Sequence, residues 1–436
     1  MFPVACFFNF CTRVRSITLV SVNKPDPDGK SDNPFLVAGV IFVAHAIKHI
    51  YNSGRYRMIN PEIRKGLGLS YSQLGSLDTS SHVSAWISNM LAGYLGERFS
   101  RDTGLMLGIS LALMAGSIGL AGFVNNYGSM LAVMFLIGIG PAMFHPPAIG
   151  ELSHRFPPHK RGFAVSLHGM GANLGEVLGP VAFASLLSFM IWRDALKTSV
   201  LPLFIVAFAV WVLLSLNRRE SVDGSPKISG KDYFRSMYDL MKNRIVLILI
   251  ITTALRSVGD GAVEGFLTTY MIEDLNYSFA FVAILVSSAQ IAGIISQPVM
   301  GYASDRVGRK PVLVVGSALL MTAAFVLSVA RPGIQVFIAI LLRGALTYSL
   351  HHIFVAAALD AANGIAQSTI VSLIYGSGFA GTLSPTVAGL ISDRYGIHSA
   401  FLCGGIVLIV PTVVLALTNF SGPSEAFKDK AQKDRS

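Results

Sequence analysis

The segment Gly301-Tyr-Ala-Ser-Asp-Arg-Val-Gly-Arg-Lys310 decides the fold, because the chain carries a second version of it. That version is Gly93-Tyr-Leu-Gly-Glu-Arg-Phe-Ser-Arg-Asp102, about 208 positions earlier. Each copy joins two long apolar stretches and places acidic and basic side chains on the short turn between them. A hydrophobic chain with this repeat is predicted to consist of two related halves that cross a membrane.

The composition is that of a membrane protein. Of the 436 residues, 52% are hydrophobic and 13% are charged, whereas soluble domains average about 25% charged residues. The net charge of +10 is not organised into basic helices, aromatic–basic clusters or zinc-finger spacing, so we expect no nucleic-acid partner. Cys6, Cys11 and Cys403 are too few and too scattered for a disulfide framework or a metal knuckle.

We predict an all-α membrane protein with twelve transmembrane helices in two pseudo-symmetric halves of six, since apolar runs of roughly 20 residues cross a bilayer. The expected spans are 34–58, 71–93, 104–123, 128–151, 161–190, 198–216, 244–271, 278–303, 311–330, 333–357, 366–391 and 398–419. Residues 1–33 are expected to be a cytoplasmic segment without a signal peptide, 34–216 the first half, 217–243 a cytoplasmic linker, 244–419 the second half and 420–436 a cytoplasmic tail.

The distribution of Lys and Arg sets the expected orientation. With the N-terminus in the cytoplasm, 23 of them fall in cytoplasmic segments and 8 in outer loops. Because positively charged loops stay on the cytoplasmic side, we expect both termini and the linker there, in a multi-pass protein of the cell (inner) membrane. The remaining three, Lys48, Arg256 and Arg343, are expected inside the membrane.

The two loop segments resemble the pattern G-x-L-x-D-R-x-G-R-K/R of the major facilitator superfamily. The later copy matches it at Gly301, Asp305, Arg306, Gly308, Arg309 and Lys310, and the earlier copy keeps Gly93, Leu95, Arg98 and Arg101 but has Glu97 in place of Asp. The chain is also similar to the fosmidomycin-resistance-like subfamily through Phe144-His-Pro and His168-Gly-Met-Gly-Ala-Asn-Leu-Gly-Glu-Val-Leu-Gly-Pro180. The resemblance implies the major facilitator fold, a monomer, alternating access and a gating role for both loop motifs.

Ionisable side chains inside the spans are the candidate functional residues, because burial in a bilayer is costly for them. Arg256, Asp260 and Glu264 share one face of span seven. Several cations at similar depth favour an anionic substrate among them. We expect substrate contacts from Lys48, His145, Asn173, Arg256, Arg343 and His352, and proton coupling through His45, His49, Glu176, Asp260 and Glu264.

Other interpretations of these residues stay open. Arg256 and Asp260 also fit a structural ion pair, and buried histidines also fit packing roles. His45 and His49 have the spacing of a zinc-binding pair, but no Cys or carboxylate nearby in the sequence completes a tetrahedral set, so no metal or other cofactor is expected. Glycines such as Gly171, Gly175 and Gly179 are interpreted as allowing close helix packing.

We therefore expect a secondary transporter, not an enzyme, that moves a small organic anion or amphiphile by alternating access. The sequence has no ATP-binding P-loop, and titratable groups in the spans favour proton-coupled export. The open alternatives are a proton-linked importer of organic anions, such as carboxylates or sugar phosphates, and a membrane scaffold or receptor. The expected partners are the small-molecule substrate, protons and the lipid bilayer.

Overall fold

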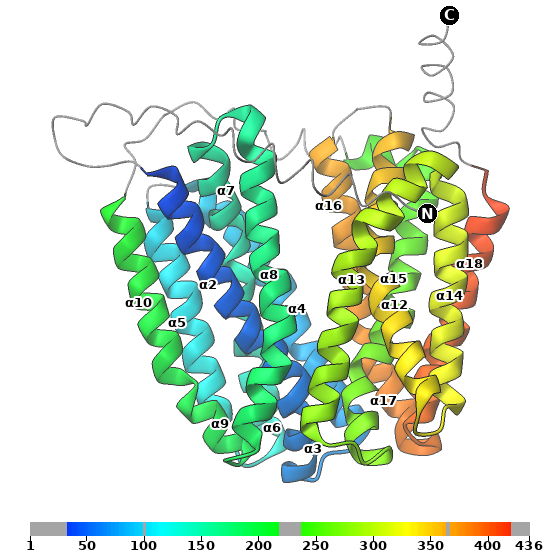
Figure 1. Ribbon diagram of the computed structural model, residues 1–436, viewed down its shortest axis with the longest axis horizontal. Helices are drawn as coiled ribbons and strands as arrows, with labels where there is room; N and C mark the ends of the chain where they lie inside the picture. The colour runs from blue at the N-terminus through cyan, green and yellow to red at the C-terminus, as the bar shows by residue number, and fades with distance from the viewer. Residues whose placement is uncertain (1–32, 99–101, 218–236, 363–366, 420–436) are drawn as a thin grey trace, which may run out of the picture.

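A computed structural model of the protein describes residues 33–98, 102–217, 237–362 and 367–419. Within these ranges the chain forms helices and no strand. The helices make two bundles that stand side by side (Figure 1). The predicted all-α fold in two halves is therefore confirmed. Most of the expected N-terminal segment, linker and tail lies outside the described residues.

The helices of the first half form one bundle (Figure 1). They are α2 (Pro34–Gly54), η2 (Arg55–Ile59), α3 (Asn60–Leu67), α4 (Tyr71–Arg98), α5 (Thr103–Ala121), α6 (Tyr127–Met143), α7 (His145–Arg155), α8 (Pro158–Leu187), α9 (Trp192–Thr198) and α10 (Val200–Leu216). The second half contains α12 (Arg244–Thr269), η4 (Tyr270–Asp274), α13 (Phe279–Val307), α14 (Arg309–Val329), α15 (Ile334–Ala361), α16 (Gln367–Ser377), η5 (Gly378–Leu383), α17 (Ser384–Tyr395) and α18 (His398–Leu417).

Ten helical stretches of the described chain are long and apolar enough to span a membrane. The two remaining predicted spans are not long and apolar enough as single helices, for local reasons. Helix α4 carries many serines together with Asp78 and His82, which lower its hydropathy. The eleventh span is interrupted, because the 3₁₀ turn η5 separates α16 from α17.

The first helix of each half begins with the same cap. The side chain of Asn33 accepts hydrogen bonds from the backbone amides two and three residues further on, at 3.1 and 3.2 Å. The side chain of Asn243 does the same at the start of α12, at 3.0 and 3.3 Å. Such caps satisfy amides that have no partner within the helix. The shared cap is consistent with two halves of common design.

The first span is longer than predicted and contains two arginines that the Lys and Arg count assigned to an outer loop. Elements α2, η2 and α3 form one helical stretch, Pro34–Leu67, whereas the predicted span ends at residue 58. Arg55 and Arg57 fall within the predicted span, but the charge count placed them in the first outer loop; the structure buries them inside the span, 3% and 7% exposed. Both fall in the π-helical turn η2, a type of turn that is frequent at functional sites.

Three glycines of α8 allow α2 to approach it closely. An added Cβ would lie 2.3 Å from the carbonyl oxygen of Ala46 at Gly175, and 2.6 Å from that of Ile50 at Gly179. At Gly171 the nearest backbone oxygen would be 2.7 Å away. The interpretation of these glycines as packing residues is confirmed. The close approach brings the side chains of α2 against those of α8.

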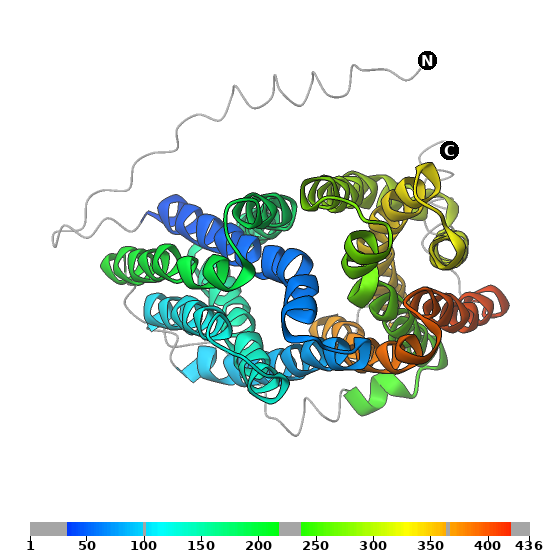
Figure 2. The ribbon, with the colours of Figure 1, turned by 90° about the horizontal axis from the view of Figure 1, so that it is seen from below.

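The two halves contact each other at the end of the molecule opposite the starts of α2 and α12 (Figures 1 and 2). Arg64 of α3 forms an ion pair with Glu273 of η4. Asp393 of α17 accepts hydrogen bonds from the backbone amides of Tyr71 and Ser72 at the start of α4, at 2.6 and 3.1 Å. At the other end the ribbons of the two halves diverge (Figure 1).

Candidate functional site

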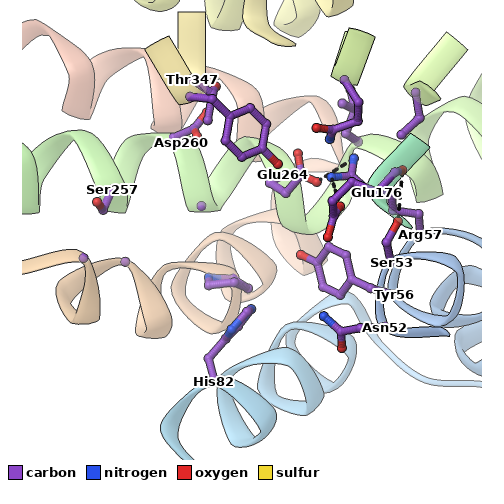
Figure 3. Close-up of a pocket in the computed structure, with 18 of the residues that line it drawn as sticks. Asn52, Ser53, Tyr56, Arg57, His82, Glu176, Ser257, Asp260, Glu264 and Thr347 are labelled. Carbon is purple, nitrogen blue, oxygen red and sulfur yellow. Dashed lines mark hydrogen bonds and ion pairs between the residues drawn. The ribbon is translucent and has the colours of Figure 1, made fainter. Parts of the chain in front are cut away.

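A cavity of about 440 Å³ lies between the two halves. Its volume is in the range of small-molecule sites, roughly 300–1,000 Å³. Both halves supply side chains to its lining, as Figure 3 shows. The arginines and carboxylates among its lining residues are Arg55, Arg57, Glu176, Arg256, Asp260, Glu264 and Arg343.

Two arginines share three carboxylates across this cavity. The guanidinium of Arg57 lies 2.9 Å from Glu264 and 3.7 Å from Glu176 (Figure 3). The guanidinium of Arg343 lies 2.5 Å from Glu264 and 2.8 Å from Asp260. Arg57 belongs to the first half and Glu264 to the second. Their ion pair therefore joins the two halves through the centre of the molecule.

The charge of Arg55 is balanced by a carboxylate of the first half. It donates a hydrogen bond to Asn60 at 3.2 Å, and Asn60 donates one to the carboxylate of Asp78 at 2.7 Å. All three side chains are buried. This chain of polar groups links α4 to the π-helical turn and holds that turn in place.

Arg256 forms no salt bridge within the described residues and, unlike Arg55, has no hydrogen bond there to a side chain that leads on to a carboxylate. Its guanidinium donates to the backbone oxygen of Thr347 at 3.5 Å and lies 6.0 Å from the ring centroid of Phe354. The predicted partner Asp260 pairs with Arg343 instead. A buried arginine with unused donors is suited to bind a carboxylate or phosphate through two parallel hydrogen bonds.

Several predicted site residues lie outside the cavity, inside the first half. Lys48 is 2% exposed, and its ammonium lies 2.6 Å from Nε2 of His145. His45 stacks on His168 with ring centroids 3.7 Å apart. Nδ1 of His49 lies 2.8 Å from Glu176, which connects this cluster to the cavity. Lys48 and Arg256 are both predicted substrate contacts, but of the two only Arg256 lines the cavity.

Two further predicted substrate contacts are not among the lining residues. Asn173 is half-buried on α8, and His352 is exposed on α15, where its ring bonds to the backbone oxygen of Tyr348 at 2.8 Å. Arg57 was not among the predicted site residues because its charge was counted with the first outer loop. The sequence signal for a longer helix is Gly68, which ends α3 with a φ of 63°, as a C-terminal glycine cap typically does.

The second loop motif forms an ion-pair cluster between α13, α14 and α15. Arg309 pairs with Asp305 in the preceding helix and lies 3.0 Å from Asp360 of α15. It also donates to the hydroxyl of Ser304 at 2.7 Å. Gly308, with a φ of 100°, makes the turn that brings these groups together.

Other residues of the motifs make weaker contacts or cannot be described. Arg306 lies over the ring of Tyr302, 4.7 Å from its centroid, and Lys310 donates to Asn419 at 3.1 Å. An added Cβ at Gly301 would meet nothing within 4 Å. The side chains of the first copy, Gly93, Glu97, Arg98 and Arg101, lie outside the described residues.

Comparisons with known proteins agree with this architecture. The family model of the Major Facilitator Superfamily matches residues 41–255 and again residues 249–435. The chain is 27% identical to the multidrug resistance protein MdtG of Klebsiella pneumoniae (strain 342), over 74% of this chain and 78% of that protein. It is 23% identical to the fosmidomycin resistance protein of Escherichia coli (strain K12), over 87% of this chain and 92% of that protein.

Solved structures share the fold at low sequence identity. A bacterial homologue of the human lysosomal transporter Spinster, in an inward-facing and unoccupied conformation, matches with a TM-score of 0.70 and 14% identity, over 88% of this chain and 96% of that one. A D-xylose–proton symporter matches with a TM-score of 0.70 and 16% identity, over 87% and 97% of the two chains.

Proposed function

The chain belongs to the Major Facilitator Superfamily of membrane transport proteins, and we propose that it exports a small organic anion by alternating access in exchange for protons. It is a multi-pass membrane protein and a transporter, not an enzyme. Its similarity to multidrug and fosmidomycin resistance proteins supports export. The excess of Lys and Arg in the termini and linker supports a cytoplasmic location for these segments.

The observation that carries the anionic substrate is the unpaired guanidinium of Arg256 in the central cavity. The other cavity arginines are matched by carboxylates, either directly or through Asn60. A buried charge without a partner is costly in a membrane span, so its presence indicates a ligand of opposite charge. A carboxylate, phosphate or phosphonate bound there would complete its hydrogen bonds.

Glu264 is the carboxylate that we propose for proton coupling. It accepts from Arg57 of the first half and from Arg343 of its own half. When Glu264 takes up a proton, its ion pairs with Arg57 and Arg343 are both lost. Arg343 still has an ion pair with Asp260. Protonation would therefore weaken the bond between the halves in particular. A change at this point biases the equilibrium between two arrangements of the halves, as alternating access requires.

The described conformation fits one end state of this cycle. The contacts of Arg64 with Glu273 and of Asp393 with the start of α4 close one end of the central space. In the proposed orientation this closed end faces outward, and the diverging end faces the cytoplasm (Figure 1). The Asp305–Arg309–Asp360 cluster lies at the cytoplasmic end and would serve as its gate.

Transport by sealed proteoliposomes, with and without an imposed pH gradient, tests the proposal. We expect the gradient to drive movement of a radiolabelled organic anion, with fosmidomycin among the anions tried, in vesicles containing the protein and not in empty ones. Glu264→Gln is expected to retain anion binding but lose the response to the gradient. Equal transport with and without the gradient would contradict proton coupling, and the sign of the response distinguishes export from import.

A further inference from the structure

We propose that the first half contains a binding site for a divalent transition-metal ion such as Zn²⁺, formed by His45, His49 and His145. One ring nitrogen from each of these histidines lies within 4.8 Å of the others. Two of the histidines are on α2, and the third is the first residue of α7. The sequence suggested only the first two, because α7 reaches them only through the packing of the bundle.

Hydrogen bonds already fix two of the rings in the state that metal binding needs. Nδ1 of His45 lies 2.7 Å from the backbone oxygen of His168, and Nδ1 of His49 lies 2.8 Å from a carboxylate oxygen of Glu176. Both oxygens only accept, so each Nδ1 carries the proton and each Nε2 presents a lone pair. Metal-bound histidines usually donate their other ring N–H to such a carbonyl or carboxylate.

Neither lone pair has a partner among the residues that the structure describes. Nε2 of His45 and Nε2 of His49 are buried and accept no hydrogen bond from that part of the chain. A buried acceptor left unsatisfied is destabilising, so its presence calls for a ligand. A shared metal ion would satisfy both nitrogens together.

The third ligand is held by Lys48. Nε2 of His145 lies 2.6 Å from the ammonium of Lys48, so this nitrogen already faces a cation. A metal ion and the ammonium would compete for the same lone pair. The lysine therefore keeps the third imidazole oriented without metal, and it must release that imidazole when the ion binds.

Packing makes the cluster rigid enough to act as a site. The ring of His45 stacks on His168 at 3.7 Å and on Phe144 at 5.5 Å between centroids. Gly175 leaves room for His49, since an added Cβ would lie 2.4 Å from the Cβ of that histidine. Zinc–nitrogen bonds of 2.0–2.1 Å place tetrahedral ligands about 3.3 Å apart, so the nitrogens need to close by about 1.5 Å at most.

The donor set identifies the class of ion. Three imidazoles suit Zn²⁺, Cu²⁺, Ni²⁺ or Co²⁺, whereas Mg²⁺ and Ca²⁺ prefer oxygen ligands. Three protein ligands leave one position of a tetrahedral ion free for water or another ligand. The site is separate from the proposed anion contact at Arg256, because none of the three histidines is among the residues that line the cavity. It does not depend on the proposed transport function.

Zinc binding by the purified full-length protein tests this proposal. The protein would carry a tag without histidine, be stripped with a chelator, and be titrated with Zn²⁺ by calorimetry and with Co²⁺ by visible absorption. We expect one ion per chain and no response to Mg²⁺. His45→Gln, His49→Gln and His145→Gln should each weaken binding by about tenfold or more, as loss of a ligand or its support does. His398→Gln, at the far end of the second half, is the matched control and should bind normally.

The lysine gives a second test that does not depend on losing a ligand. Lys48→Met removes the competing cation, so it should bind Zn²⁺ more tightly than the native protein, and zinc should raise its thermal unfolding temperature further. Equal zinc affinity in the native protein and the three histidine variants would overturn the proposal. Absence of binding at millimolar Zn²⁺ in both the native protein and Lys48→Met, or an unchanged affinity in Lys48→Met, would also overturn it.

Discussion

The ion pair between Arg57 and Glu264 is a charged contact between the two halves at the cavity. Neutral hydrogen bonds also join the halves, from Ser287 to the backbone oxygen of Val177 and from Thr79 to that of Thr382. In Arg57→Met, Glu264 keeps Arg343 and Glu176 keeps His49, so neither carboxylate is left alone. What is lost is one charged hydrogen bond of 2.9 Å and a 3.7 Å contact too long to be a hydrogen bond. A hydrogen bond to a charged group contributes about 1.5–3 kcal/mol.

Loss of this energy should shift the equilibrium between arrangements in which the outer end is closed and those in which it is open. At about 1.4 kcal/mol per factor of ten, the loss favours separation of the halves by roughly ten- to a hundredfold. The shift should be near the upper figure because the Arg57 side chain is only 9% exposed and solvent screens the pair little. Arg57→Met should therefore populate conformations in which the outer end is open.

Distances between spin labels would measure this shift. Labels at Asn125→Cys and Arg331→Cys, both exposed at the closed end, would be placed in a protein without its three native cysteines. In Arg57→Met we expect a larger population with a longer distance between the two labels. In Lys242→Met, a control that removes an exposed cation, this population should stay small. A distance distribution in Arg57→Met that matches the native one would refute the role of this pair in holding the halves together.

Three further predictions concern the gate, the packing and the orientation. Asp305→Asn should reduce transport without loss of membrane insertion, because it removes a carboxylate from the gate at a cost of about 1–2 kcal/mol; normal transport in vesicles would count against a gating role. Gly175→Ala should lower the thermal unfolding temperature, since overpacking costs about 1–3 kcal/mol, whereas Gly169→Ala, with nothing within 4 Å, should not. Cysteines at Ser225 and Ser129 should be labelled from opposite sides of the membrane, and labelling of both from outside intact cells would contradict the orientation.

The fold was predictable because its signals are local. Apolar runs, the repeated loop and the glycines at spacing four each depend on a short stretch of sequence. The structure agrees with the apolar runs and the glycines, and it describes the second copy of the loop. The end of the first span was wrong because Glu62, Arg64 and Lys65 look like loop residues when charge alone is considered. The same reasoning counted Arg55 and Arg57 with the outer loop. Charged residues inside a membrane span become interpretable only when their partners on other helices are known.

The pairing in the site could not be predicted for the same reason. Asp260 has Arg256 four residues before it on one helix, yet it pairs with Arg343 of α15. Arg343 contacts Asp260 and Glu264 at the same time, so one desolvated guanidinium balances two carboxylates. Whether Asp260 pairs with Arg256 or with Arg343 depends on how α12 and α15 pack. The spacing of residues in the sequence carries no information about that packing.

Transport of a matched anionic and neutral substrate by Arg256→Met in proteoliposomes tests whether Arg256 binds the anion. We expect this variant to lose transport of the anion far more than of the neutral compound. Adding Asp260→Asn should not restore transport, because Asp260 is the partner of Arg343. Recovery of anion transport with normal affinity in the double variant would contradict the account and reduce Arg256 to a structural counter-ion.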